Sequence, residues 1–175
     1  MIALHDKEFV PFISNDEIKN AITKMAKEIE KDFKDDVPVF VGVLNGSFMV
    51  VAELASKYHF DCEFTFVRLS SYDGIESTGK VKKLIGLNQG LAGRSVVIVE
   101  DIVDTGTTVL ELKKLFKKEN VKCLKFATLF FKPEAYRQSI KIDYIGIDVQ
   151  DKFIVGYGLD YKGLGRNLQN VYQLK

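Results

Sequence analysis

The spacing of apolar residues predicts three helices. Between about Ser14 and Lys34, apolar side chains recur every three or four residues, which places them on one buried helix face. Ser14 and Glu17 have the spacing of a capping box, in which two backbone N–H groups at the helix start are satisfied. Similar stripes begin at Phe48 and after Thr108. The members of the three stripes are Ile18, Ala21, Ile22, Met25, Ala26, Ile29 and Phe33; Phe48, Val51, Ala52 and Ala55; and Val109, Leu112, Leu115 and Phe116.

Short apolar runs between these stripes predict strands. Val37–Leu44 is almost continuously apolar, which is typical of a strand covered on both faces. We expect Lys83–Asn88 and Ser95–Glu100 to form a strand pair through a turn at Gly90 and Gly93. The remaining predicted strands are Cys62–Leu69, Cys123–Phe131, Tyr144–Val149 and Phe153–Tyr157.

Strands that alternate with helices indicate an α/β fold, with a mostly parallel sheet and helices on both faces. Ligands of such folds bind beyond the carboxyl ends of the strands. The active face should therefore hold Asn45–Ser47, Glu100–Thr108 and the residues after Phe131. The polar segment from Ser70 to Lys83 predicts a long mobile loop, and loops of that length are often functional.

Composition narrows the class of protein. The length favours a single domain over residues 1–175, and 46% apolar with 28% charged residues is typical of a globular chain. A net charge of +1 argues against a protein that coats nucleic acid or an anionic membrane. No apolar signal core or membrane span is evident, so we expect a soluble, cytoplasmic protein. The two cysteines and two histidines are isolated from one another, which favours neither a metal cluster nor a disulfide framework.

The segment from Val96 to Thr108 carries the strongest chemical signal. An apolar strand ends in Glu100 and Asp101, and Asp104 then opens a Thr/Gly turn into a helix. Backbone N–H groups at such a turn and helix start, with threonine hydroxyls, can cradle a phosphate. Carboxylates beside a phosphate would repel it unless they bind Mg²⁺ or sugar hydroxyls. The segment therefore predicts a phosphorylated sugar bound together with a metal ion.

Two other motif interpretations are less favoured. Asp104-Thr105-Gly106 also matches the triplet of aspartic proteases, but those proteins are all-β, whereas strands and helices alternate here. The chain has no Gly-x-x-x-x-Gly-Lys-Ser/Thr sequence, so it is not a Walker-type nucleoside triphosphatase.

Glu100–Thr108 closely resembles the phosphoribosyl-pyrophosphate signature of the type I phosphoribosyltransferases. Other matches, spread from about Val37 to Leu168, resemble the hypoxanthine/guanine (6-oxopurine) branch of that family. These matches are a pyrophosphate loop at Leu44–Phe48, a flexible loop at Ser71-Tyr72 with Ser77–Gly79, a strand end at Phe131-Lys132, a purine-pocket segment at Asp151–Tyr161, and Arg166.

The resemblance implies a type I phosphoribosyltransferase fold, with a small hood and a flexible loop over the site. It implies purine salvage, in which the 5-phosphoribosyl group of phosphoribosyl pyrophosphate is transferred to N9 of hypoxanthine or guanine. IMP or GMP and pyrophosphate are the products, and Mg²⁺ is the cofactor. It further implies a homodimer or homotetramer, with neither nucleic acid nor membrane as a partner.

The resemblance also assigns roles to residues of this chain. Asp104 would be the general base for the proton on purine N7. The phosphoribosyl pyrophosphate and its phosphate would be bound by Glu100, Asp101, Asp104, Thr105, Gly106, Thr107 and Thr108, and the pyrophosphate by Asn45, Gly46 and Arg166. Ser71 and Tyr72 belong to the flexible loop. The purine would contact Lys132, Lys152, Phe153, Ile154 and Asp160, and Mg²⁺ would be held by Glu100, Asp101 and Asp160.

Asn45 departs from the family pattern, because many members carry Lys or Arg at this position. Asn45 cannot supply a positive charge to the pyrophosphate, so we expect the loop to act through its backbone. We predict a non-proline cis peptide bond between Asn45 and Gly46.

Two alternatives stay open at this stage. One is an RNA-binding regulator of the same fold, in which a tyrosine tends to replace the acid at Asp104; Asp104, Lys132 and the near-neutral charge favour the enzyme. The other is a phosphoribosyltransferase with a different base, such as a xanthine-preferring enzyme. A lysine ammonium can only donate hydrogen bonds, so Lys132 favours a 6-oxo over a 6-amino purine. The preference among hypoxanthine, guanine and xanthine is left open.

Overall fold

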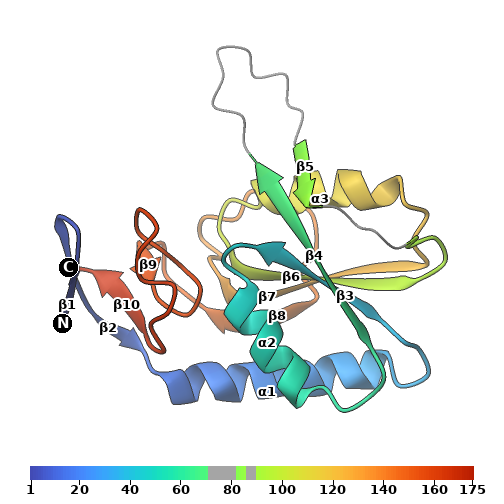
Figure 1. The fold of residues 1–175 in the computed structure, drawn as a ribbon, viewed down its shortest axis with the longest axis horizontal. Helices are drawn as coiled ribbons and strands as arrows, with labels where there is room; N and C mark the ends of the chain where they lie inside the picture. The colour runs from blue at the N-terminus through green and yellow to red at the C-terminus, as the bar shows by residue number, and fades with distance from the viewer. Residues whose placement is uncertain (71–81, 86–89) are drawn as a thin grey trace.

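The computed structural model describes residues 1–70, 82–85 and 90–175, and its largest element is a six-stranded sheet (Figure 1). The strand order is β5-β4-β3-β6-β7-β8. Five strands run parallel, and β5 pairs antiparallel to β4 at one edge. This confirms the predicted mostly parallel sheet. Its strands are β3 (Val39–Leu44), β4 (Glu63–Ser70), β5 (Lys82–Ile85), β6 (Ser95–Val103), β7 (Cys123–Phe131) and β8 (Tyr144–Asp148).

Helices cover both faces of this sheet, as predicted. α1 (Asn15–Asp32) and α2 (Phe48–Lys57) share one hydrophobic cluster with Phe40 and Val97 of the central strands. α3 (Thr107–Lys117) packs on the opposite face against Val41 and Ile98. Side chains alternate between the two faces and both faces are covered, so the middle of the central strands is apolar, as in Val96–Val99 of β6. None of the helices in the described ranges is long and apolar enough to cross a membrane.

α1 begins with the predicted capping box. The Glu17 backbone N–H donates to Ser14 Oγ at 3.3 Å, and the Ser14 backbone N–H donates to Glu17 Oε2 at 2.9 Å. Both contacts join residues three positions apart, so the sequence spacing alone sets this helix start.

Two expectations about strands were wrong. β5 pairs with β4 rather than with β6, which lies between β3 and β7. Val96–Val99 of β6 are apolar on both faces of the strand. A central position in the sheet buries both faces, whereas the edge position of a hairpin would leave one side of the strand unpaired. The strand predicted at Phe153–Tyr157 is limited to β9 (Ile154–Val155), because the backbone turns through positive φ angles from Gly156 to Gly158.

A second, four-stranded antiparallel sheet forms the small hood. Its order is β1-β2-β10-β9, with β1 (Ile2–Leu4), β2 (Lys7–Ile13) and β10 (Val171–Leu174). The first and last segments of the chain therefore lie side by side, and both termini are found at this end of the molecule (Figure 1). The hood carries β9 and the turns that follow it.

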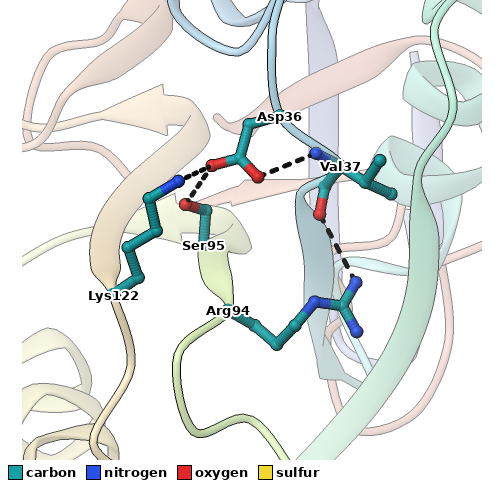
Figure 2. A network of polar contacts seen from close by, with 5 residues as sticks. All are labelled: Asp36, Val37, Arg94, Ser95 and Lys122. Carbon is teal, nitrogen blue, oxygen red and sulfur yellow. Dashed lines mark hydrogen bonds and ion pairs between the residues drawn. The ribbon is translucent and has the colours of Figure 1, made fainter.

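At the amino ends of the main-sheet strands, a polar network joins the starts of several strands (Figure 2). Asp36 accepts hydrogen bonds from Lys122 Nζ at 2.8 Å, Ser95 Oγ at 2.7 Å and the Val37 backbone N–H at 2.9 Å. These residues stand at or just before β3, β6 and β7. The hydrogen bonds from Lys122 and Ser95 lower the pKa of Asp36 from 3.8 to about 2.

Candidate active site

Two adjoining clefts lie at the carboxyl ends of the central strands. The first, of about 360 Å³, is lined by Val43, Leu44, Gly46, Leu69 and Glu100–Val109. The second, of about 190 Å³, is lined by Asp101, Ile102, Asp104, Lys132, Lys152, Phe153, Ile154, Leu159, Asp160 and Arg166. The clefts share Asp101, Ile102 and Asp104, so a ligand in one would meet a ligand in the other at these residues. The strand–helix pattern of the sequence predicts a ligand site at these carboxyl ends.

The first cleft contains an anion cradle between β6 and α3. Gly106 caps the helix with a φ of 82°, a left-handed conformation that favours glycine, and a Cβ there would overlap the Tyr136 ring. The first helical hydrogen bond is the one from Leu110 N–H to the Gly106 carbonyl at 3.0 Å. The N–H groups at Thr107 and Thr108 therefore have no partner within the helix, and together with the positive end of the helix dipole they can bind an anion.

Beside this cradle lies a buried pair of acids. Burial raises the pKa of Glu100 well above its usual 4.5, and the neighbouring Asp101 charge adds to the effect. Burial also raises the pKa of Asp101, although its carboxylate accepts a hydrogen bond from the Ile102 N–H at 2.9 Å. Glu100 Oε1 is buried and has no hydrogen-bond partner among the described residues. The pair therefore favours a cation or hydroxyl donors as its ligand.

The donor chemistry of this pair fits Mg²⁺. Within the described ranges, no group of three or more His, Cys, Asp or Glu side chains is arranged to hold a metal ion on its own. Mg²⁺ usually binds through one or two carboxylates and completes its shell with water and substrate phosphate. A site of this kind would hold the ion jointly with a phosphorylated substrate.

The loop after β3 presents its backbone to the first cleft. A Cβ on Gly46 would overlap the Asp101 carboxylate, and a Cβ on Gly158 would overlap the Gly46 carbonyl oxygen. Asn45 is exposed and lines neither cleft, while Leu44 and Gly46 on either side of it line the first. The cis peptide bond of this loop joins Leu44 to Asn45, so the prediction of Asn45–Gly46 was wrong by one residue. Sequence indicates a glycine-containing turn here, but the contact with Asp101 that shapes it comes from another strand.

Lys132 lies at the boundary of the second cleft and is 7% exposed. Its Nζ donates to Asp104 Oδ2 at 2.7 Å and to Asp151 Oδ1 at 3.0 Å. Burial by itself would lower the pKa of Lys132, but the hydrogen bonds and charges of the two carboxylates outweigh it and raise that pKa. The lysine therefore keeps its positive charge at the second cleft at neutral pH.

The Phe153 ring is held at the second cleft by hood aromatics. Its centroid lies 5.8 Å from that of Tyr161 in an edge-on arrangement and 6.2 Å from that of Phe9. The Tyr161 hydroxyl in turn donates to Asp6 at 2.9 Å. The Phe153 side chain is still 46% exposed, so it can offer a surface for stacking.

Asp160 and Arg166 form an ion pair at the same cleft. Arg166 Nη1 also donates to the Gly158 carbonyl at 2.7 Å, and the Gly163 N–H donates to Asp160 at 2.6 Å. The positive charge of Arg166 lowers the pKa of Asp101, and the negative charge of Asp160 raises it. The sequence-predicted residues Asp160 and Arg166 are thus brought close to the acid pair of the first cleft.

Some site residues were missed by sequence reasoning, and two predicted ones cannot be placed. Asp151 was part of the purine-pocket segment but had no role of its own, and its contact with Lys132 was not foreseen. Ile102 and Leu159 also line the second cleft; an apolar residue in an acidic or glycine-rich segment offers no signal that distinguishes it from core. Ser71 and Tyr72 lie outside the described residues.

The fold and the paired clefts define a phosphoribosyltransferase, and comparison with known proteins agrees. Residues 14–162 match the model of the phosphoribosyl transferase domain, so the chain belongs to this family. A hypoxanthine-guanine phosphoribosyltransferase of Staphylococcus epidermidis is 39% identical over 164 residues, which cover 93% of this chain and 92% of that protein. The enzyme of that name from Bacillus subtilis is 37% identical over 172 residues, 98% of this chain and 95% of its own.

Solved structures give the same family. A crystal structure of a Bacillus anthracis hypoxanthine-guanine phosphoribosyltransferase, with a HEPES molecule in its active site, superposes with a TM-score of 0.89. It is 36% identical and covers 97% of this chain and 100% of that one. A hypoxanthine phosphoribosyltransferase from Staphylococcus aureus also has a TM-score of 0.89 at 34% identity, covering 97% of this chain and 92% of that one.

Proposed function

We propose that this protein is a purine-salvage enzyme that transfers the 5-phosphoribosyl group of phosphoribosyl pyrophosphate to N9 of hypoxanthine or guanine. The observation that carries the proposal is that Asp104 lines both clefts. One cleft offers an anion cradle and an acid pair, as a phosphorylated sugar requires. The other offers a charged lysine and an aromatic ring, as a 6-oxopurine requires. The names of the relatives support the same reaction.

The donor would bind in the first cleft. The 5-phosphate would accept hydrogen bonds from the backbone and hydroxyls of Thr105–Thr108, and the ribose hydroxyls would donate to Glu100 and Asp101. Glu100, Asp101 and Asp160 would hold Mg²⁺, which when bound neutralises charge on the pyrophosphate. Gly46 of the first cleft and Arg166 of the second would bind the pyrophosphate. Asn45 is exposed, so we assign the loop contact to its backbone.

In the reaction, the bond from the anomeric carbon to pyrophosphate breaks with its electron pair leaving on oxygen. The bond from that carbon to purine N9 forms, and the proton on N7 passes to Asp104. Glu100 and Asp101 would stabilise positive charge on the ribose during the transfer. Lys132 would donate to the oxygen on purine carbon 6, Phe153 would stack on the ring, and the backbone at Lys152 and Ile154 would read its edge.

The proposal is tested by nucleotide formation from phosphoribosyl pyrophosphate and Mg²⁺, with hypoxanthine, guanine, xanthine and adenine offered separately. We expect 6-oxopurines to react and Asp104→Asn to lower kcat by about 10²-fold or more, since general base catalysis contributes about 10²–10⁴-fold. Asp35→Asn is the matched control, because Asp35 is exposed at the opposite edge of the sheet and should leave turnover unchanged.

Absence of product from every purine would overturn the assignment, and a salt-sensitive RNA complex would then favour the regulatory alternative. A higher kcat/KM for xanthine than for the other bases would replace the proposed substrate by xanthine. We also expect a homodimer or homotetramer, as in the family; sedimentation of the purified protein at several concentrations would distinguish these from a monomer.

A further inference from the structure

The ammonium of Lys132 is held between two carboxylates that come from different strand ends. Asp104 follows β6 and Asp151 follows β8, while Lys132 follows β7, which lies between those strands. The Lys132 side chain is 8% exposed, against 45% for Asp104 and 61% for Asp151. The lysine is thus the buried member of the three, and the two acids reach it from the solvent side.

The donors of this ammonium can be counted. A lysine ammonium has three N–H groups, and two of them are directed to Asp104 and Asp151. No residue in the described ranges accepts the third, which is left for another acceptor. The Lys132 backbone N–H bonds to the Val103 carbonyl at 3.0 Å, so the base of the side chain is also fixed to the neighbouring strand. With the side chain anchored at both ends, the direction of the third N–H is determined by the positions of the two carboxylates.

From this geometry we propose that Asp151 is a positioning residue that acts through Lys132 and aims its free N–H at the carbonyl on carbon 6 of the purine. The proposal rests on the proposed function above. Asp104 cannot do this alone, because one anchor leaves the ammonium free to rotate about a single contact. Asp104 must also accept a proton during transfer, and a second carboxylate keeps the lysine from pairing with it exclusively.

Loss of Asp151 should therefore affect recognition of the base and not binding of phosphoribosyl pyrophosphate. Lys132 would be retained by Asp104 only, so recognition of the base would weaken while binding of phosphoribosyl pyrophosphate, which lies in the other cleft, would not. We expect Asp151→Ala to lower kcat/KM for hypoxanthine by about tenfold, the size expected for a charge-assisted hydrogen bond that is partly exposed. The preference for hypoxanthine over adenine should fall as well, because the aimed N–H is what distinguishes a carbonyl from an amino group.

The experiment compares Asp151→Ala, Asp151→Asn and Asp151→Glu with Asp148→Asn. Asp148 is an exposed aspartate three residues earlier that lines neither cleft, so its variant controls for loss of one negative charge nearby. We expect Asp151→Glu to recover most of the activity lost in Asp151→Ala, Asp151→Asn to be intermediate, and KM for phosphoribosyl pyrophosphate to be unchanged throughout.

A double-mutant cycle with Lys132→Ala then tests whether Asp151 acts through Lys132. If Asp151 acts through Lys132, Asp151→Ala has no further effect once the lysine is absent. Calorimetric binding of IMP supplies the same cycle where turnover of the Lys132→Ala variants is too slow to measure. The proposal is overturned if Asp151→Ala causes an equal loss in the wild-type and Lys132→Ala backgrounds. It is also overturned if Asp151→Ala has wild-type kinetics, or if KM for phosphoribosyl pyrophosphate rises as much as kcat/KM for hypoxanthine falls. Failure of the wild-type protein to form any nucleotide would instead reject the proposed function.

Discussion

Replacement of Asp36 tests how the main sheet is held together at the edge opposite the clefts. Asp36 receives three hydrogen bonds, and one donor, Ser95, is only 2% exposed (Figure 2). Asp36→Ala removes all three acceptor contacts and leaves the Ser95 hydroxyl buried without its acceptor. Such an unsatisfied hydroxyl costs about 1–3 kcal/mol.

The lowered pKa of Asp36 bounds the electrostatic part of the effect. The change from 3.8 to about 2 corresponds to at most about 2 kcal/mol, at about 1.4 kcal/mol per pKa unit. Lys122 is 61% exposed, so solvent screens its share to about 1 kcal/mol or less. We therefore expect Asp36→Ala to lower the free energy of unfolding by about 2 kcal/mol and Asp36→Asn by about 1 kcal/mol. For a chain of this length, 2 kcal/mol lowers Tm by about 4–8 °C.

The pH dependence gives a second, independent check. Because the folded-state pKa lies below the unfolded value of 3.8, the stabilisation is complete above about pH 4 and is lost as the pH falls through about 2. Urea unfolding followed by circular dichroism should show the deficit of Asp36→Asn at pH 7 shrinking between pH 4 and 2.5. Asp35→Asn is the control, since Asp35 is exposed and, among the described residues, pairs only with the exposed Lys34. A loss below about 0.5 kcal/mol for Asp36→Ala, or a deficit of Asp36→Asn that does not change with pH, would refute this account.

Two further predictions concern the first cleft. In Gly46→Ala the new Cβ must displace the Asp101 carboxylate, so we expect KM for phosphoribosyl pyrophosphate to rise at least about tenfold. In Gly90→Ala the new Cβ would meet no atom of the described residues within 4 Å, so KM should stay unchanged; equal values for both variants would contradict the argument. In Glu100→Gln the penalty of burying a charge is removed. Because burial raises the folded pKa of Glu100 above 4.5, the wild-type protein loses stability as pH rises past that value. The variant should therefore be more stable at pH 7 in the presence of a chelator, with the gain vanishing near pH 4.5, as measured by urea unfolding; a less stable variant at pH 7 would contradict it.

Local signals in the sequence were sufficient for several elements. The capping box of Ser14 and Glu17 set the start of α1, and β7 has the predicted bounds Cys123–Phe131. The acidic strand end and Thr/Gly turn of Glu100–Thr108 likewise lie at a cleft, as predicted. Each of these signals depends on residues close together in the chain, such as a side chain that bonds a backbone group three residues away.

Pairings between distant segments were not readable in the same way. The hood depends on the pairing of β2 with β10, which lies more than 150 residues later in the chain. The sequence pattern of neither strand predicts which strand it pairs with. Local sequence patterns likewise do not predict that β5 pairs with β4, or that Lys132 forms ion pairs with Asp104 and Asp151.

The division between sequence and tertiary structure therefore follows the range of the interactions. The sequence by itself determined the apolar faces, the helix start and the chemical types available at the strand ends, because caps and hydrophobic periodicity act over a few residues. Only the tertiary structure decided that Gly46 faces Asp101, that Asp36 joins three strand starts, and that Lys132 stands between two acids. Those contacts depend on how strands are ordered in the sheet, and strand order is set by burial over the whole molecule.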